Sequence, residues 1–209
     1  MKQKLWIGIG VVLIFLIGIG VFIWFNKENN ALENNREPEI IEDEPNDNQP
    51  TINERSVVIY FSATGNTERI ANLINEVTNN DIIEIVPKVA YTSEDLNYNN
   101  DDSRANKEQQ DSESRPEIAE EIDITNYDVI YLGYPIWWED VPHIILTFLD
   151  NQYMSEKTII PFCTSGGSGI STSVETLKEY SNGRVLEGRR FSGNATKDEV
   201  ENWLKSLNL

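Results

Sequence analysis

Short apolar runs alternate with amphipathic stretches over most of the chain. Val57–Phe61 is apolar throughout, as expected of a strand that is buried on both faces of a sheet. In the next stretch, Thr67–Thr78, apolar residues recur at the spacing of one helix face, and Asp81–Val86 again has the pattern of a strand. The chain therefore begins this region with a strand–helix–strand unit.

The same alternation continues to the end of the chain. It implies a parallel sheet with helices on both faces, so we predict one doubly wound, three-layer α/β domain with five strands over residues 56–209. Between the second and third strands lies an irregular insert, residues 87–114, in which Tyr91 and Tyr98 favour a partly ordered flap near the site. The further strands are expected at 127–134, 157–164 and 184–191, and the further helices at 141–150, 169–180 and 196–207.

The N-terminus has a different pattern. Leu5–Phe25 contains no charged residue and is long enough to cross a bilayer as a helix. Trp6 and Trp24 lie near its two ends, where indole rings favour the membrane interface. The sequence after Phe25 has no A-x-A-like cleavage site, so we predict an uncleaved transmembrane anchor at residues 5–25, with a cleaved signal peptide as the alternative.

The charges that flank this segment indicate its orientation. Lys2 and Lys4 lie on the short side, and basic residues near the ends of a span favour the cytoplasm, so residues 1–4 are expected there. Residues 26–55 are polar, acidic and rich in Asn, Glu and Pro, which is typical of a flexible linker. We therefore expect a single-pass protein of the cell membrane whose α/β domain lies outside the cytoplasm.

Composition narrows the choice of partner. Lysine and arginine together number 17 and aspartate and glutamate 35, which gives a formal net charge of −18. This balance argues against nucleic acid as a partner and permits docking on a basic protein, although it also fits a role in solubility alone. Cys163 is the only cysteine in the sequence and there is one histidine, so neither an intramolecular disulfide nor a zinc cage is expected.

The first turn of the predicted sheet is unusually rich in hydrogen-bonding residues. The sequence SATGNT places hydroxyls at Ser62, Thr64 and Thr67 around Gly65 and Asn66, between a strand and a helix. A helix N-terminus exposes unpaired N–H groups with partial positive charge, and a glycine lets the backbone approach an anion closely. The turn therefore predicts a phosphate cradle; ordinary helix capping, the alternative, needs only one such residue.

Two further strand ends carry candidate binding residues. In YPIWW, Trp137 and Trp138 follow the third strand and offer flat aromatic surface for stacking on a planar ring, although one of them is expected to pack into the core. In CTSGGSG, the glycines Gly166, Gly167 and Gly169 leave backbone N–H groups free to approach a bound ring. A flexible loop is the simpler alternative for this segment.

These three loops resemble those of flavodoxins, which bind FMN and share the strand order 2-1-3-4-5. The resemblance covers residues 56–209, and SATGNT is similar to the family's phosphate loop. It implies FMN as the cofactor and assigns Trp137, with Trp138 as a second candidate, to stacking on the isoalloxazine ring. The cofactor-binding residues that it implies are Ser62, Thr64, Gly65, Asn66, Thr67, Pro135, Ile136, Trp137, Trp138, Thr164, Ser165, Gly166 and Gly167.

The chain also departs from that family. Many flavodoxins cover the second face of the flavin with a tyrosine from the last loop, but this loop has no aromatic residue. One ring face is therefore expected to be open, or covered by Tyr91 or Tyr98. Two other classes of protein are excluded. A receiver domain needs an aspartate at the end of the third strand, where the chain has Gly133–Pro135, and a low-molecular-weight tyrosine phosphatase needs an arginine at the position of Gly169.

Two functions are compatible with these residues. The first is an electron carrier in which FMN supplies the redox chemistry and the acidic surface attracts basic redox proteins. The second is an FMN-dependent reductase of quinones or similar small acceptors that uses NADH or NADPH. The open ring face favours the reductase, while the lack of an evident acid–base residue favours the carrier, and a binding module that has lost its flavin is a third reading.

Overall fold

The computed structural model describes residues 55–207. The predicted N-terminal segment, anchor and most of the linker, at residues 1–4, 5–25 and 26–54, lie outside the described residues. Among residues 55–207, no helix combines the length and the apolar character that a bilayer crossing requires.

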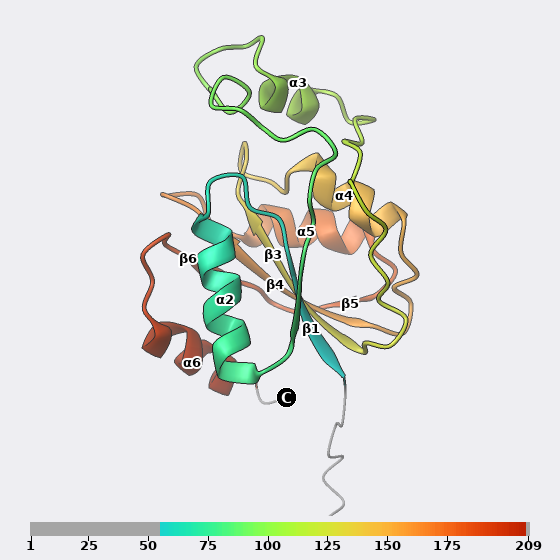
Figure 1. Cartoon of the computed structure of the whole chain (residues 1–209), viewed down its shortest axis with the longest axis vertical. Coiled ribbons are helices and arrows are strands. Elements are labelled where there is room, and N and C mark those ends of the chain that lie inside the picture. Colours follow the sequence, from blue (N-terminus) through green and yellow to red (C-terminus); the bar gives the residue numbers. More distant parts are fainter. Residues whose placement is uncertain (1–54, 208–209) are drawn as a thin grey trace, which may run out of the picture. The chain divides into compact units, whose positions relative to one another are not determined.

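A parallel sheet forms the middle layer of the described domain (Figure 1). The strand order is β2-β1-β3-β4-β5, which confirms the predicted 2-1-3-4-5, and a further strand, β6, also pairs with β4. The order reverses between β1 and β3, so a crevice opens there at the carboxyl ends of the strands. The strands are β1 (Ser56–Tyr60), β2 (Asp81–Glu84), β3 (Val129–Pro135), β4 (Thr158–Thr164), β5 (Arg184–Val185) and β6 (Arg189–Phe191).

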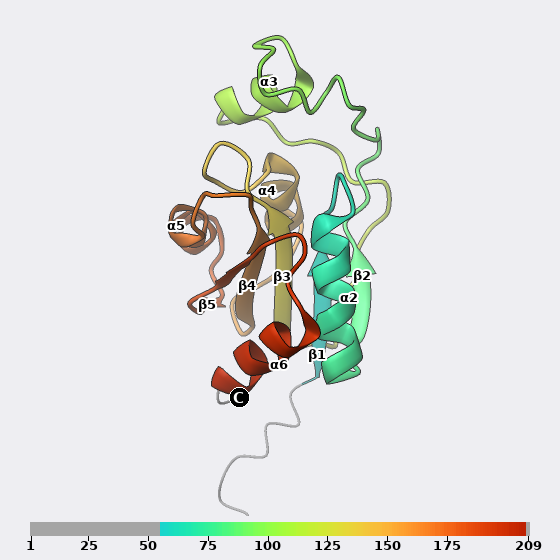
Figure 2. The same cartoon turned by 90° about the vertical axis from the view of Figure 1, so that its left-hand side faces the viewer.

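Helices cover both faces of the sheet. Because side chains alternate along a strand, Ile59 and Leu132 face one cluster of buried residues while Val58 and Tyr131 face another. The first cluster includes the apolar faces of α4 and α5, and the second those of α2 and α6, which lie together on one side of the sheet in Figure 2. The helices are α2 (Asn66–Thr78), α3 (Arg104–Gln110), α4 (His143–Asp150), α5 (Ser171–Tyr180) and α6 (Lys197–Ser206).

The prediction of a single last strand at 184–191 is wrong, because that stretch forms β5 and β6 with a break between them. The carbonyl of Ile159 in β4 accepts a hydrogen bond from the Leu186 amide. Pro161 lies two residues further along β4, so its backbone faces the same side of that strand, toward residues 184–191. Proline has no N–H to donate to the ladder. Gly188 lies at the break, where an added Cβ would be 2.7 Å from the Pro161 carbonyl oxygen.

The insert is more ordered than its sequence indicated. It contains α3. An antiparallel bridge joins Pro87, where the insert begins, to Ile118, shortly after its predicted end, and closes the base of the insert. The Lys88 amide donates to the Glu117 carbonyl at 2.8 Å, which holds the same base closed. The insert then extends beyond the carboxyl ends of the strands, where α3 lies above the sheet in Figures 1 and 2.

One close approach in the central strand gives a test of this packing. A Cβ at Gly133 would overlap with the ring of Phe162 on the neighbouring strand β4. We expect Gly133→Ala to lower the free energy of unfolding by roughly 1–3 kcal/mol, the usual range for overpacking a core. Denaturant unfolding followed by tryptophan fluorescence measures the change.

Gly169→Ala is the matched control, because an added Cβ there meets nothing within 4 Å. It should change the free energy of unfolding by less than about 0.5 kcal/mol, as surface substitutions usually do. Equal effects of the two substitutions would contradict the close packing of β3 on β4.

Candidate functional site

A cavity of about 440 Å³ lies at the carboxyl ends of the strands, where the strand order reverses. Its volume is within the usual range for small-molecule sites. The turn after β1, the loop after β3 and the insert all contribute to its wall. The lining residues are Ser62, Ala63, Thr64, Thr67, Leu96, Tyr98, Ala105, Pro135, Ile136, Trp137 and Trp138.

The turn after β1 leaves the N-terminus of α2 available to a ligand. Gly65 caps the helix in the left-handed conformation, with φ of 82°, and no side chain caps α2 within the described residues. The side-chain amide of Asn66 instead donates to the Thr64 hydroxyl at 3.2 Å. The first backbone N–H groups of α2 therefore keep their capacity to bind an anion.

Two hydroxyls in this region are buried. The oxygen of Ser62 has no hydrogen-bond partner among residues 55–207, although Ser62 lines the cavity. A buried hydroxyl without a partner is costly, and an oxygen of a bound phosphate would provide one. The hydroxyl of Thr67 lies 2.8 Å from that of Thr164, so this pair ties the first helix to the end of β4.

The loop after β3 presents its two tryptophans differently. Trp137 and Asp140 exchange backbone hydrogen bonds of 3.0 and 2.9 Å, which closes a tight turn. Inside that turn Trp138 and Glu139 have positive φ values of 46° and 67°. Such strain in non-glycine residues concentrates at functional sites. Trp138 is exposed over 43% of its surface.

Trp137 packs within an aromatic cluster instead. Its ring is edge-on to Phe61 at 5.5 Å and to Tyr91 at 5.1 Å between centroids. The expectation that one indole packs inward therefore fits Trp137 better than Trp138, yet both line the cavity. Which of them stacks on a ring stays a prediction.

The loop after β4 supplies none of the described lining of this cavity, although Thr164 at the end of β4 contacts the lining residue Thr67. Thr164 is buried, the amide of Gly167 donates to the Ser165 hydroxyl at 3.1 Å, and the Arg190 guanidinium donates to the Ser165 carbonyl. Nothing lies within 4 Å of an added Cβ at Gly166 or Gly167, so a ligand can approach this backbone. The assignment of these residues, and of Gly65 and Asn66, to cofactor binding stays a prediction.

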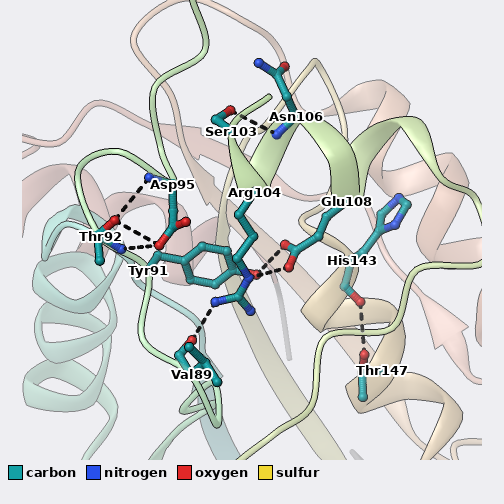
Figure 3. A network of polar contacts seen from close by, with 10 residues as sticks. All are labelled: Val89, Tyr91, Thr92, Asp95, Ser103, Arg104, Asn106, Glu108, His143 and Thr147. Atoms are coloured by element: carbon teal, nitrogen blue, oxygen red, sulfur yellow. Dashed lines mark hydrogen bonds and ion pairs between the residues drawn. The ribbon is translucent and has the colours of Figure 1, made fainter. Parts of the chain in front are cut away.

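The insert contributes lining that sequence patterns did not predict. Leu96 and Ala105 join Tyr98 in the wall of the cavity. The length of the insert and its tyrosines were the available signals, and they gave no reason to select these two residues. Figure 3 shows the polar network behind them, in which the Tyr91 hydroxyl donates to Glu108 at 2.6 Å and Arg104 donates to the same carboxylate at 2.6 Å.

Among the described residues, no charged side chain lines the cavity. Burial, followed by the neighbouring Glu84 and Glu68, raises the pKa of Tyr60 to about 12. Burial and the hydrogen bond to Glu108 raise the pKa of Tyr91, so both phenols stay neutral at physiological pH. His143 is half-buried at the start of α4, and burial followed by the charge of Arg115 lowers its pKa.

These features together suit a phosphorylated ligand with a flat ring. An uncapped helix N-terminus and a buried hydroxyl without a partner among residues 55–207 belong to the turn after β1, and two indoles belong to the loop after β3. With the order of the parallel strands, they define a nucleotide-binding protein of the doubly wound α/β class. The residues present therefore fit FMN.

The comparisons with known proteins agree with this class. The family model described as Flavodoxin matches residues 55–207. The chain belongs to the flavodoxin family. Because flavodoxins are FMN proteins, this membership confirms FMN as the cofactor expected from the sequence.

Solved structures extend the comparison. A putative flavoprotein from Bacteroides eggerthii DSM 20697 is 38% identical with a TM-score of 0.71, over 75% of this chain and 99% of that one. One from Bacteroides uniformis ATCC 8492 is 39% identical with a TM-score of 0.70, over 73% and 98%. A flavoprotein from Lactobacillus acidophilus NCFM, solved in complex with FMN, is 26% identical with a TM-score of 0.57, over 72% and 99%. Comparison with curated proteins finds no match.

The unpaired hydroxyl of Ser62 gives a test with two readouts. We expect Ser62→Ala to leave the free energy of unfolding unchanged or to raise it, because it removes a buried polar atom that has no partner. The same change should weaken FMN binding roughly tenfold to a hundredfold, since a hydrogen bond to a charged group contributes about 1.5–3 kcal/mol. Denaturant unfolding without FMN and titration with FMN measure the two effects.

Ser173→Ala is the control, because the buried Ser173 hydroxyl donates to the Ile170 carbonyl at 2.8 Å and lies outside the cavity lining. It should destabilise the protein and leave FMN affinity unchanged. The role of Ser62 is contradicted if Ser62→Ala behaves like this control.

Proposed function

We propose that the protein binds FMN in this cavity and carries electrons between redox partners. One observation carries the choice of a carrier over an enzyme: among the described residues that line the cavity there is no Asp, Glu, His, Lys or Arg. Side chains of these types most often transfer protons to and from substrates, and the lining offers only the Tyr98 phenol in their place. A carrier needs only to hold the cofactor, which supplies the redox chemistry when bound.

The chain's own residues would then bind and shield the cofactor. Hydrogen-bond donors of the turn after β1 would hold the phosphate without a cation, because the Arg69 guanidinium is engaged with the carbonyls of Gly193 and Ala195 at 2.7 and 2.6 Å. Trp137, Trp138 and Ile136 would cover the ring with apolar surface. The net charge of −18 would attract basic redox proteins to the molecule.

The absorbance spectrum of the purified protein, with chromatography of the released cofactor, tests this function first. We expect a yellow protein that contains FMN and oxidises NADH or NADPH slowly with quinone acceptors. A colourless protein that takes up no FMN at micromolar concentration would contradict FMN binding. Rapid turnover of NADH or NADPH with quinones would instead support the reductase.

The membrane anchor belongs to the same proposal. The uncharged segment Leu5–Phe25 would hold the protein in the cell membrane, and residues 26–55 would link it to an FMN domain outside the cytoplasm. Such an arrangement suits a carrier that serves partners at the membrane surface.

Protease treatment of intact cells tests this topology. We expect cleavage within residues 26–55 to release the FMN domain, because an acidic, proline-containing linker is accessible to protease. Lysed cells are the control and should be cleaved in either case. A domain that is protected in intact cells and cleaved only after lysis would place it in the cytoplasm.

A further inference from the structure

Residues 190–195, which end β6 and lead into α6, connect two loops of the site, although none of them belongs to the described lining of the cavity. We call them the β6–α6 connector. Within it the Ala195 amide donates to the Ser192 carbonyl at 3.1 Å, which closes a turn. Thr196 then forms a capping box with Glu199 at the start of α6. The connector is therefore fixed at both ends, by the pairing of β6 with β4 and by the capped helix.

One end of the connector is joined to the loop after β4. The Arg190 guanidinium donates to the Ser165 carbonyl at 3.1 Å, and the Ser165 amide donates to the Phe191 carbonyl at 3.2 Å. Phe191 is buried and packs edge-on against Trp203 of α6, with 5.4 Å between the ring centroids. The connector therefore has a buried anchor next to the loop after β4.

The other end is held by α2, the helix that follows the turn after β1. Arg69 donates from Nε to the Gly193 carbonyl at 2.7 Å and from Nη2 to the Ala195 carbonyl at 2.6 Å. Asn66 lies three residues earlier on the same face of α2, and its side chain contacts Gly193. An added Cβ on Gly193 would be 2.6 Å from Asn66 Oδ1 and 3.0 Å from its Cγ. The Asn66 side chain therefore occupies the space that a side chain at position 193 would need.

Asn66 connects Gly193 to a residue of the cavity wall. Its side-chain amide donates to the Thr64 hydroxyl at 3.2 Å, and Thr64 lines the cavity. A hydroxyl has one proton and two lone pairs, so a lone pair that accepts from Asn66 leaves the proton available for donation. A phosphate oxygen accepts such a proton, and the contact with Asn66 therefore prepares Thr64 to bind a phosphate group. A methyl group at Gly193 would displace Asn66 and release the Thr64 hydroxyl.

We propose that the β6–α6 connector sets the affinity of the site for phosphate through Asn66 and Thr64, with Gly193 and Arg69 as positioning residues. The inference rests on the proposed function, in which FMN binds in this cavity with its phosphate at the turn after β1. Gly193 acts by having no side chain, because a Cβ there takes the space of Asn66. Arg69 acts by geometry and not by charge, since its guanidinium holds two carbonyls of the connector in place.

The experiment measures the dissociation constants of FMN and of riboflavin for wild-type protein and two variants of the full chain. The two ligands share the ring, so the ratio of the riboflavin constant to the FMN constant reports on the phosphate contacts alone. Gly193→Ala pushes against Asn66. Arg69→Lys keeps the positive charge and loses the two-point contact, because an ammonium group lacks the fixed fork of a guanidinium.

Each variant has a matched control outside the described lining of the cavity. Gly183→Ala also adds a crowded Cβ, which would be 2.8 Å from the Met154 carbonyl oxygen. Arg115→Lys also removes a guanidinium that donates to two carbonyls, those of Ser112 at 3.0 Å and Ser114 at 2.8 Å. Both controls should lower stability and leave the ratio of dissociation constants at its wild-type value.

We expect Gly193→Ala and Arg69→Lys each to lower the ratio roughly tenfold, which corresponds to the loss of one hydrogen bond to a charged group. Riboflavin affinity should stay close to that of wild type in both variants. A purely structural role would instead weaken the two ligands alike and leave the ratio unchanged. If Arg69 acted through its charge, Arg69→Lys would keep the wild-type ratio.

The outcomes separate this inference from the proposed function. Wild-type protein that binds no FMN overturns both. Wild type that binds FMN and riboflavin equally well overturns the inference and leaves binding of the flavin ring in place. An unchanged ratio in one variant overturns the role of that residue, and an unchanged ratio in both overturns the inference. If Gly193→Ala does not fold, Arg69→Lys decides alone, and a ratio that falls equally in the controls contradicts the inference as well.

Discussion

The binding site depends on a helix that begins without a side-chain cap. Gly65 takes the left-handed conformation that turns the chain from β1 into α2, and within the described residues no side chain satisfies the first amides of that helix. These amides remain able to bind an anion because the nearby hydroxyls bond to other side chains instead of capping the helix. Thr64 accepts from the side chain of Asn66, and Thr67 pairs with Thr164. A negatively charged group at this turn completes what the fold leaves unsatisfied.

A second constraint lies in the loop after β3. Trp138 and Glu139 both have positive φ, a conformation that residues other than glycine rarely adopt. The two backbone hydrogen bonds between Trp137 and Asp140 maintain it. The two consecutive indoles differ in their surroundings, since Trp137 packs against Phe61 and Trp138 is exposed at the cavity. Hydrogen bonds from Gln109 then couple this loop to the insert, so the walls of the site support one another.

Much of the fold could be predicted from periodicity, because strands buried on both faces and amphipathic helices leave strong patterns. The break in the last strand could not, since it results from Pro161 on the neighbouring strand. The helix α3 was missed because its sequence, RANKEQQ, has Ala105 as its single apolar residue and so shows no helical pattern. Its order comes from buried contacts such as that of Asn106. Leu96 and Ala105 reach the cavity only through that folded insert, so no local pattern could identify them.

Comparison of FMN with riboflavin tests most directly whether the uncapped turn holds the phosphate of FMN. The two ligands share the ring and differ by the phosphate, so the ratio of their dissociation constants isolates the turn after β1. Charge-assisted hydrogen bonds contribute about 1.5–3 kcal/mol each, so FMN should bind at least a hundredfold more tightly than riboflavin. Equal affinities would mean that the turn does not bind the phosphate and would contradict the account.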